Sequence, residues 1–357
     1  MSHEANSPSS QTHRSRRNIR GFGIGQSLLM AGVMALGVLF ITSYAGAFHD
    51  PRPKEIPLGV VAPAPEAKAL VAELKKLPGN PVSPRVLGSA EEARQHIMER
   101  KLYGALVIEP DKSSDQLLLA SAAGPPAAEA LRKAVEQFEA AQQPPRSVAA
   151  TDIVPVGRGD SLGLSAFYLV VGWCVAGYLC ASLLAISFGF RMTSMRQAVI
   201  RLAALAVYAI GCGLLGTVVI GPILGAMPGS VVDLWWVGAL TVFAVGSVTF
   251  GFQGVAGVVG IGLTILIVVI AGNPSSGGVY PYPMLPTFWR EIGPALPTGA
   301  GVWSTRSIAY FANHAMLGPL LTLAAWAAGG TAVTLGATAF HRRQDRKKSA
   351  QKSAPSH

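Results

Sequence analysis

The sequence predicts a polytopic α-helical membrane protein with six transmembrane helices and a small extracytoplasmic α/β domain inserted between helices 1 and 2. Half of the 357 residues are hydrophobic and only 13% are charged, whereas soluble globular proteins carry about 25% charged residues. The deficit is confined to five runs that contain no Asp, Glu, Lys or Arg, and a stretch of ordinary polarity separates the first two. The runs are Gly21–Phe48, Ser161–Phe190, Leu202–Val232, Leu234–Trp289 and Ser307–Phe340.

The length of each run sets the number of crossings. A helix crosses the roughly 30 Å hydrocarbon core with about 20 apolar residues. Four runs fit one crossing each, and the run from Leu234 fits two, with a turn near Gly251–Gly254. Helix 1 occupies residues 23–48, and the other five form a membrane domain over residues 161–340. The expected crossings are Ile24–Ala47, Leu164–Ser187, Leu202–Leu224, Leu234–Phe252, Val255–Ala271 and Met316–Phe340.

The distribution of charge orients these helices. The tail at residues 1–22, the loop Arg191–Arg201 and the tail at residues 341–357 together hold 13 basic and 2 acidic residues. Residues 49–160 hold 14 basic and 15 acidic residues. An even number of crossings places the three basic segments on one side, which the positive-inside rule makes cytoplasmic. The sequence pI near 9.7 is then explained by topology signals beside anionic lipid, and nucleic acid is not an expected partner.

The first apolar run also resembles an export signal. Ser15-Arg16-Arg17 precedes it, and Ala45-Gly46-Ala47 resembles a cleavage site. A signal peptide has an apolar region of about 7–15 residues, and this run is nearly twice as long. We therefore expect a retained crossing; N-terminal sequencing that starts at Phe48 would contradict the six-helix prediction.

Residues 49–160 read as a small α/β domain. Strands are expected at Ile56–Val61, Ser83–Gly88, Tyr103–Ile108 and Gln116–Ser121, and residues 150–156 lead back to the membrane. Helices are expected after Pro65, from Ser89 to about Lys101, and around a stripe of Leu131, Val135 and Phe138. Ser89 and Glu92 form a capping box, in which each side chain accepts a hydrogen bond from the other residue's backbone N–H.

The sequence nominates no catalytic, cofactor-binding or metal-binding residue. The histidines of the α/β domain, His49 and His96, have no nearby Ser or Cys in a recognised nucleophile motif. All three cysteines lie within expected crossings, where they read as small packing residues. No G-x-x-x-x-G-K-[ST] motif occurs, so the chain does not bind ATP in the P-loop manner. We expect a protein that is not an enzyme.

A segment rich in Pro, Gly and aromatic residues, Gly272–Gly299, interrupts the last apolar stretches. Backbone that is not helical cannot face lipid, because each unpaired polar group costs several kcal/mol there. We therefore expect the segment to lie at the outer surface or to dip in against other helices. Tyr280, Tyr282, Phe288 and Trp289, together with the nearby Trp303, suit a membrane interface.

Two stretches resemble a known family. Ser89–Ser121, with the matching residues Lys101, Tyr103, Gly104, Ala105, Leu106, Val107, Ile108, Pro110 and Ser114, is similar to the outer domain of ABC-2-type membrane proteins. Ser275–Ser307 resembles the stretch before the last crossing in the YhgE/Pip-like (phage infection protein) branch. The matching residues there are Gly277, Gly278, Tyr280, Pro281, Leu285, Pro286, Phe288, Pro294, Leu296, Pro297 and Arg306. One departure is Ala62–Pro65, which stands where the branch commonly has an Asn-x-Asp-x-Gly turn.

The resemblance implies a permease-like protein of the bacterial plasma membrane, with both termini cytoplasmic. It implies a homodimer that exports a lipid-like or amphiphilic substrate, with energy from a separate ABC ATPase if one binds. An outer cap-like loop, residues 272–314, would close the exit of the path. Its gating residues would be Gly277, Gly278, Tyr280, Pro281, Leu285, Pro286, Phe288, Arg290, Pro297 and Arg306. Arg191 and Arg196 would form the loop that meets the ATPase.

The arginines in these two segments also suit simpler roles. Arg290 and Arg306 would suit simple interfacial anchoring, and Arg191 and Arg196 would suit a topology signal alone. The alternative function is a membrane-anchored extracytoplasmic binding or scaffold protein, such as an envelope component or phage receptor, without transport. Six crossings exceed what anchoring requires, which favours the permease.

Overall fold

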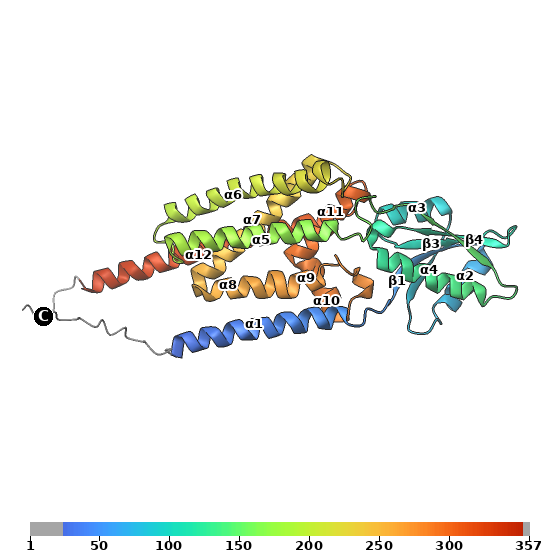
Figure 1. The fold of residues 1–357 in the computed structure, drawn as a ribbon, viewed down its shortest axis with the longest axis horizontal. Coiled ribbons are helices and arrows are strands. Elements are labelled where there is room, and N and C mark those ends of the chain that lie inside the picture. The colour runs from blue at the N-terminus through green and yellow to red at the C-terminus, as the bar shows by residue number, and fades with distance from the viewer. Residues whose placement is uncertain (1–23, 353–357) are drawn as a thin grey trace, which may run out of the picture.

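The computed structural model describes residues 24–352, and Figure 1 shows a long helical bundle with a small α/β domain at one end. The predicted tail at residues 1–22 and the last residues, 353–357, lie outside the described part. We call the end of the bundle that carries the α/β domain the domain end, and the other the tail end.

Five helices of the described residues are long and apolar enough to cross a membrane, which confirms the predicted multi-pass class. A helix needs about 20 apolar residues for that purpose. The five are α1 (Ile24–Phe48), α5 (Ser165–Phe188), α6 (Met195–Val218, continued by the π-helical turn η2, Val219–Ile223), α7 (Val231–Ala256) and α12 (Leu317–Lys352).

The remaining predicted crossing, Val255–Ala271, corresponds to a shorter apolar segment. It consists of α8 (Val259–Thr264), the π-helical η3 (Ile265–Ala271) and α9 (Gly272–Ser275). At 1.5 Å per residue this stretch is about 25 Å long, and it lies alongside α1 and α5 in Figure 1. The turn before it lies at Gly257, with a φ of +61°, and the predicted turn at Gly251–Gly254 is wrong because α7 continues to Ala256.

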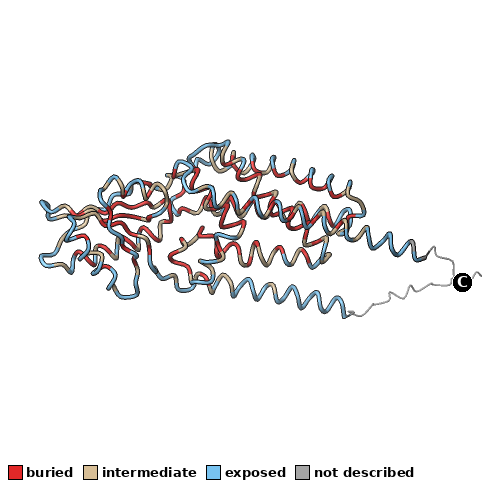
Figure 2. The backbone as a smooth tube through the Cα atoms, turned by 180° about the vertical axis from the view of Figure 1, so that it is seen from behind, coloured by how far each residue is buried: buried red, intermediate tan, exposed pale blue. Residues whose placement is uncertain are grey.

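Helix α7 is the centre of the bundle. It packs against α5, α6 and α12, and residues from several of these helices share one buried cluster that includes Trp173, Val242 and Leu323. Helix α1 lies at the edge of the bundle, where it packs mainly against the stretch from η3 to α9. Figure 2 shows α1 exposed along most of its length, as a helix surrounded by lipid or by another chain would be.

The α/β domain is a five-stranded sheet of order β2-β1-β3-β4-β5. The pairs β1–β2, β1–β3 and β4–β5 are parallel, and β3–β4 is antiparallel. The strands are β1 (Ile56–Val61), β2 (Val82–Leu87), β3 (Gly104–Val107), β4 (Ser114–Leu119) and β5 (Ser147–Asp152). The predicted small α/β domain is thus confirmed, whereas β5 was not predicted.

Three helices cover the two faces of this sheet: α2 (Ala64–Leu74), α3 (Ala90–Met98) and α4 (Pro125–Ala140). Leu74 of α2 and Leu131 of α4 share one buried cluster with the sheet. Ile97 of α3 lies in a second cluster, which also contains Phe311 from the segment that precedes α12. Met284, also from a segment before α12, lies in the first cluster, so both clusters reach the membrane part.

The capping box that opens α3 differs in one bond from the prediction. Ser89 Oγ accepts from the backbone N–H of Glu92 at 3.1 Å, as expected. Glu92 Oε2 accepts from the N–H of Gly88 at 2.7 Å, one residue before the expected donor. The predicted return bond to Ser89 is therefore wrong, although the carboxylate still satisfies a backbone donor at the start of the helix.

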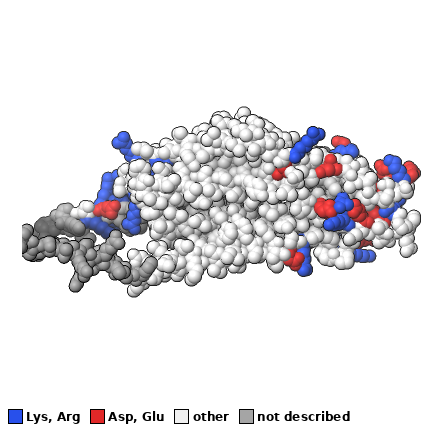
Figure 3. All heavy atoms as spheres, in the orientation of Figure 1, with Lys and Arg blue, Asp and Glu red and all other residues white. Residues whose placement is uncertain are grey.

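Charged side chains gather at the two ends of the molecule. Figure 3 shows a band without charged side chains on the visible face of the bundle, between a mostly basic tail end and an α/β domain of mixed charge. Such a band is what the hydrocarbon core of a bilayer requires.

Candidate functional site

Residues 272–314, which we call the cap, are mostly helical. After α9 come η4 (Tyr282–Met284), α10 (Thr287–Ile292), η5 (Gly293–Ala295) and α11 (Pro297–Tyr310). Irregular backbone and short helical turns are tolerated at membrane depth where other parts of the protein cover them, and most residues of α11 are buried. The expected cap-like loop is therefore a folded unit.

Helix α11 begins inside the bundle. Thr298 Oγ1 donates to Val268 O at 3.2 Å and lies 3.9 Å from Cys174 Sγ. Cys174 is nine residues into α5, about 13 Å along its axis. The chain thus descends from the domain end to η5 and returns through α11, as a re-entrant segment does.

We call the turn at η5, Gly293–Ala295, the cap tip. A Cβ atom on Gly293 would lie 1.9 Å from Ser275 O. Only glycine permits this close approach. The tip is therefore packed tightly against α9.

Arg306 holds the other end of α11. Its side chain is 4% exposed and donates to Gly277 O and Gly278 O, both at 2.8 Å, and to Gly163 O at 3.0 Å. It also reaches Ala123 O at 3.5 Å. Because Gly163 precedes α5 and Ala123 belongs to the α/β domain, one guanidinium joins the cap, the bundle and the domain. Arg306 is therefore not an exposed interfacial anchor.

Arg100 of the α/β domain contacts the same helix. Its Nη1 donates to Trp303 O at 2.7 Å and to Ser307 Oγ at 2.8 Å, and its guanidinium carbon lies 3.6 Å from the centroid of the Trp303 ring. Tyr282 also stacks on Trp303, with 5.9 Å between ring centroids. Burial lowers the pKa of Arg100 to about 9, with a smaller contribution from Arg306. Sequence reasoning missed Arg100, because nothing in the sequence places the turn after α3 against α11.

The structure places the other predicted cap residues around this junction. Gly277 has a φ of +71°, and a Cβ on Gly278 would lie 2.5 Å from the Phe167 ring. Pro281 packs on Gly124 of the α/β domain. These residues shape the contact between the cap, α5 and the domain.

The remaining predicted residues lie further along the cap. Tyr280 contacts Phe48 at the end of α1, with 5.6 Å between ring centroids. Leu285 is buried, and Phe288 is 60% exposed. Arg290 Nη1 lies 3.7 Å from Glu55 Oε2, an exposed pair of the kind that contributes little. Pro286 precedes α10, and Pro297 is the first residue of α11.

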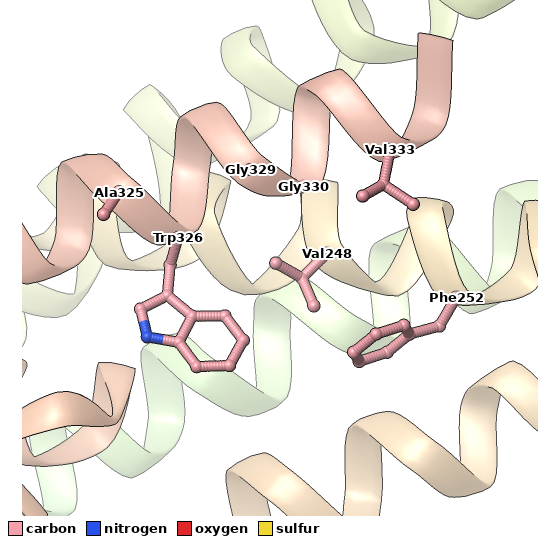
Figure 4. Close-up of a pocket in the computed structure, with 7 residues that line it drawn as sticks. All are labelled: Val248, Phe252, Ala325, Trp326, Gly329, Gly330 and Val333. Atoms are coloured by element: carbon pink, nitrogen blue, oxygen red, sulfur yellow. The ribbon is translucent and has the colours of Figure 1, made fainter. Parts of the chain in front are cut away.

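Two apolar cavities lie along α12. The first, which we call the groove, has a volume of about 290 Å³, and Figure 4 shows Trp326, Val248 and Phe252 pointing into it. Its other lining residues are Ala325, Gly329, Gly330 and Val333. The second, the domain-end cavity, has a volume of about 580 Å³. It is lined by Tyr282, Pro294, Gly299, Ala300, Trp303, Ala315, Leu317, Gly318, Pro319 and Thr322.

The cap tip meets α12 between these two cavities. Trp326 Nε1 donates to Ala295 O at 2.8 Å, and Thr322 Oγ1 approaches Pro294 O at 3.4 Å. In Figure 4 the indole nitrogen of Trp326 points away from Phe252 and the groove. Along α12, Thr322 is the last residue that lines the domain-end cavity, and Ala325 is the first that lines the groove. The tip therefore contacts α12 at the boundary between the stretches that line the two cavities.

Arg191 and Arg196 lie at the tail end of the bundle. Helix α6 begins at Met195, so Arg196 and Arg201 lie on this helix, and the predicted loop Arg191–Arg201 is too long. The physical reason is Ser194, whose Oγ accepts from Gln197 N at 3.1 Å and caps the helix there. Arg201 is buried and donates to two backbone carbonyls at the end of α5. Arg191 lines a small recess beside α12.

No protein-family model matches the chain, and comparisons with curated proteins and with solved structures find no match. Within residues 24–352, no group of three or more His, Cys, Asp or Glu side chains could hold a metal ion.

Proposed function

We propose that this protein is an ABC-2-type permease-like membrane protein that moves a lipid-like or amphiphilic substrate along α12, with the cap tip as its gate. The observation that carries the proposal is the position of the tip between two apolar cavities. Movement of the tip away from Thr322 and Trp326 would join the groove to the domain-end cavity.

The walls of the two cavities favour an apolar cargo. None of the described residues that line them is charged. Pathways for ions and protons usually contain ionisable groups at membrane depth. An acyl chain needs no such partner, so a lipid-like substrate agrees best with these walls.

The two ends of α11 differ in how firmly they are held. Near the tip, the contacts to α12 are neutral hydrogen bonds, each worth about 1 kcal/mol net. At the other end, Arg306 makes charge-assisted hydrogen bonds to backbone carbonyls of the cap and the bundle, and such bonds are about twice as strong. The cap would therefore open at its tip and stay fixed at Arg306.

The orientation of the path follows from charge. We propose that the basic tail end faces the cytoplasm of a bacterial cell and that the α/β domain lies outside the plasma membrane. An ABC ATPase, if one participates, would bind at the tail end, near Arg191 and Arg196. The exposed face of α1 would contact lipid or a second copy in a homodimer.

Inside-out membrane vesicles from cells that produce the protein test the proposal. A lipid with a fluorescent, dithionite-sensitive headgroup is added to their outer leaflet, which was the cytoplasmic one, together with ATP. Export would move the label into the inner leaflet, so the fraction protected from dithionite should rise faster than in vesicles without the protein. The proposal would be contradicted if, for each of several lipids with different headgroups, the label became protected at the same rate in vesicles with and without the protein.

The scaffold function makes a different prediction. If the helices merely anchor the α/β domain, then residues 49–160 fused to one foreign membrane helix should restore the phenotype of cells that lack the protein. The permease proposal predicts that this fusion fails, because it lacks the cap tip and both cavities.

A further inference from the structure

A small polar cavity lies where the α/β domain meets the cap. Arg100 and Arg306 both line it, and so do Tyr103, Tyr282 and Ser276. It has room for about one water molecule. Two cations from different parts of the chain thus face one small space.

The positive charge of this space is not balanced by a bonded carboxylate. Arg306 donates to backbone carbonyls, and Arg100 donates to a carbonyl and a hydroxyl. Among the described residues, Asp160 is the carboxylate whose charge acts on Arg306, and its Oδ1 accepts from the backbone N–H groups of Leu164 and Ser165. A buried charge without a counter-charge is costly, so the junction favours an anion.

One hydrogen-bond donor of Arg100 has no acceptor. Its Nε is enclosed by protein and has no hydrogen-bond partner, although other parts of the residue touch solvent. Tyr103 and Tyr282 can each donate through a hydroxyl group, because burial raises the pKa of both and keeps them protonated at neutral pH. The space therefore offers several donors and a positive potential to one small acceptor.

We infer that this junction is a binding site for one small anion of halide size, held between Arg100 and Arg306. Chloride is moderately larger than a water molecule, so the walls would need to give only slightly, whereas sulfate or phosphate would require a much larger movement. The bound anion would stabilise the contact between the α/β domain and α11, because it neutralises two cations that this contact brings together. The inference does not depend on transport.

Thermal unfolding of the purified full-length protein tests the inference. The apparent Tm is measured at constant ionic strength while chloride or bromide replaces gluconate. We expect a saturable rise of a few degrees with either halide, because a ligand that binds only the folded state raises its stability with concentration. An equal rise with sulfate, or no difference between chloride and gluconate, would overturn the proposal.

Two variants assign the effect to the junction. Arg100→Gln removes one cation, so the difference in apparent Tm between chloride and gluconate should disappear. This expectation holds whatever the substitution does to the Tm in gluconate alone. Arg85→Gln removes an exposed arginine of the same domain and should leave the difference unchanged. A halide effect that persists in Arg100→Gln, or that is lost in both variants, would contradict a site at the junction.

Fluorescence provides a second measurement that does not rely on unfolding. Trp303 lines the cavity, and bromide and iodide quench tryptophan on contact. The wild type should show a saturable component of quenching that Trp303→Phe lacks. If both proteins are quenched in proportion to bromide concentration, with no saturable component, the site does not exist.

Discussion

Replacement of Trp326 by Phe tests the contact between the cap tip and α12. The substitution keeps an aromatic ring beside the groove and removes the 2.8 Å hydrogen bond from Nε1 to Ala295 O. A neutral hydrogen bond contributes about 1 kcal/mol, and 1.4 kcal/mol corresponds to a tenfold change in an equilibrium constant. The open population of the tip should therefore rise about fivefold.

A cysteine at Ala300 reports this population. Ala300 lines the domain-end cavity one turn after the tip and is 1% exposed, so a thiol there reacts chiefly when the tip moves. The assay uses protein in lipid nanodiscs, with Cys174, Cys180 and Cys212 replaced by serine, and a polar maleimide. If opening is fast compared with the reaction, the labelling rate follows the open population.

The control for this assay is Trp236→Phe. Trp236 is 55% exposed on α7 and lies outside both cavities. Its replacement should leave the labelling rate unchanged. If Trp326→Phe labels at the wild-type rate, or if both variants accelerate it equally, then the bond to Ala295 does not hold the tip.

Three further predictions concern stability. Gly330→Ala should lower the apparent Tm, because the added Cβ would lie 2.4 Å from Val248 N and overpacking costs about 1–3 kcal/mol; Gly329→Ala, with nothing within 4 Å, should not. Ser89→Ala should cost about 1 kcal/mol by loss of the helix N-cap and should speed amide hydrogen exchange in α3. Glu139 is buried, and its pKa is raised to about 7 by burial. The folded protein then binds more protons than the unfolded chain between about pH 4.5 and 7, so the stability of the domain should fall as pH rises through this range. Hydrogen exchange should show this fall in the wild type and not in Glu139→Gln.

The sequence predicted those helices and strands whose pattern of apolar and charged residues is imposed by the lipid or protein core around them. Hydrocarbon excludes charge, so the charge-free runs became α1, α5, α6, α7 and α12. The strand Ile56–Val61 was predicted with its observed bounds because it is a short apolar run bounded by turn residues. Strand β5 was missed because its residues are mostly exposed, and an edge strand with only one large apolar residue, Val148, carries no clear alternating pattern.

The candidate site depended on contacts between distant segments, which the sequence does not specify. The resemblance pointed to Arg306, but its burial arises only when Gly163, Gly277 and Gly278 meet around it. Trp326 lies in an apolar run like any other aromatic residue, and its bond to Ala295 appears only once the cap tip enters the bundle. The two cavities could not be predicted either, because the spaces that side chains leave unfilled depend on the packing of three or more elements.

A crosslink between the cap tip and α12 tests the central claim most directly. Pro294→Cys and Thr322→Cys, in a chain without its native cysteines, are joined by a short bifunctional thiol reagent that a reductant can cleave. Lipid movement in the inside-out vesicles should stop after crosslinking and resume after reduction, while each single variant treated in the same way remains active. Undiminished lipid movement in fully crosslinked protein would contradict a gate at the cap tip.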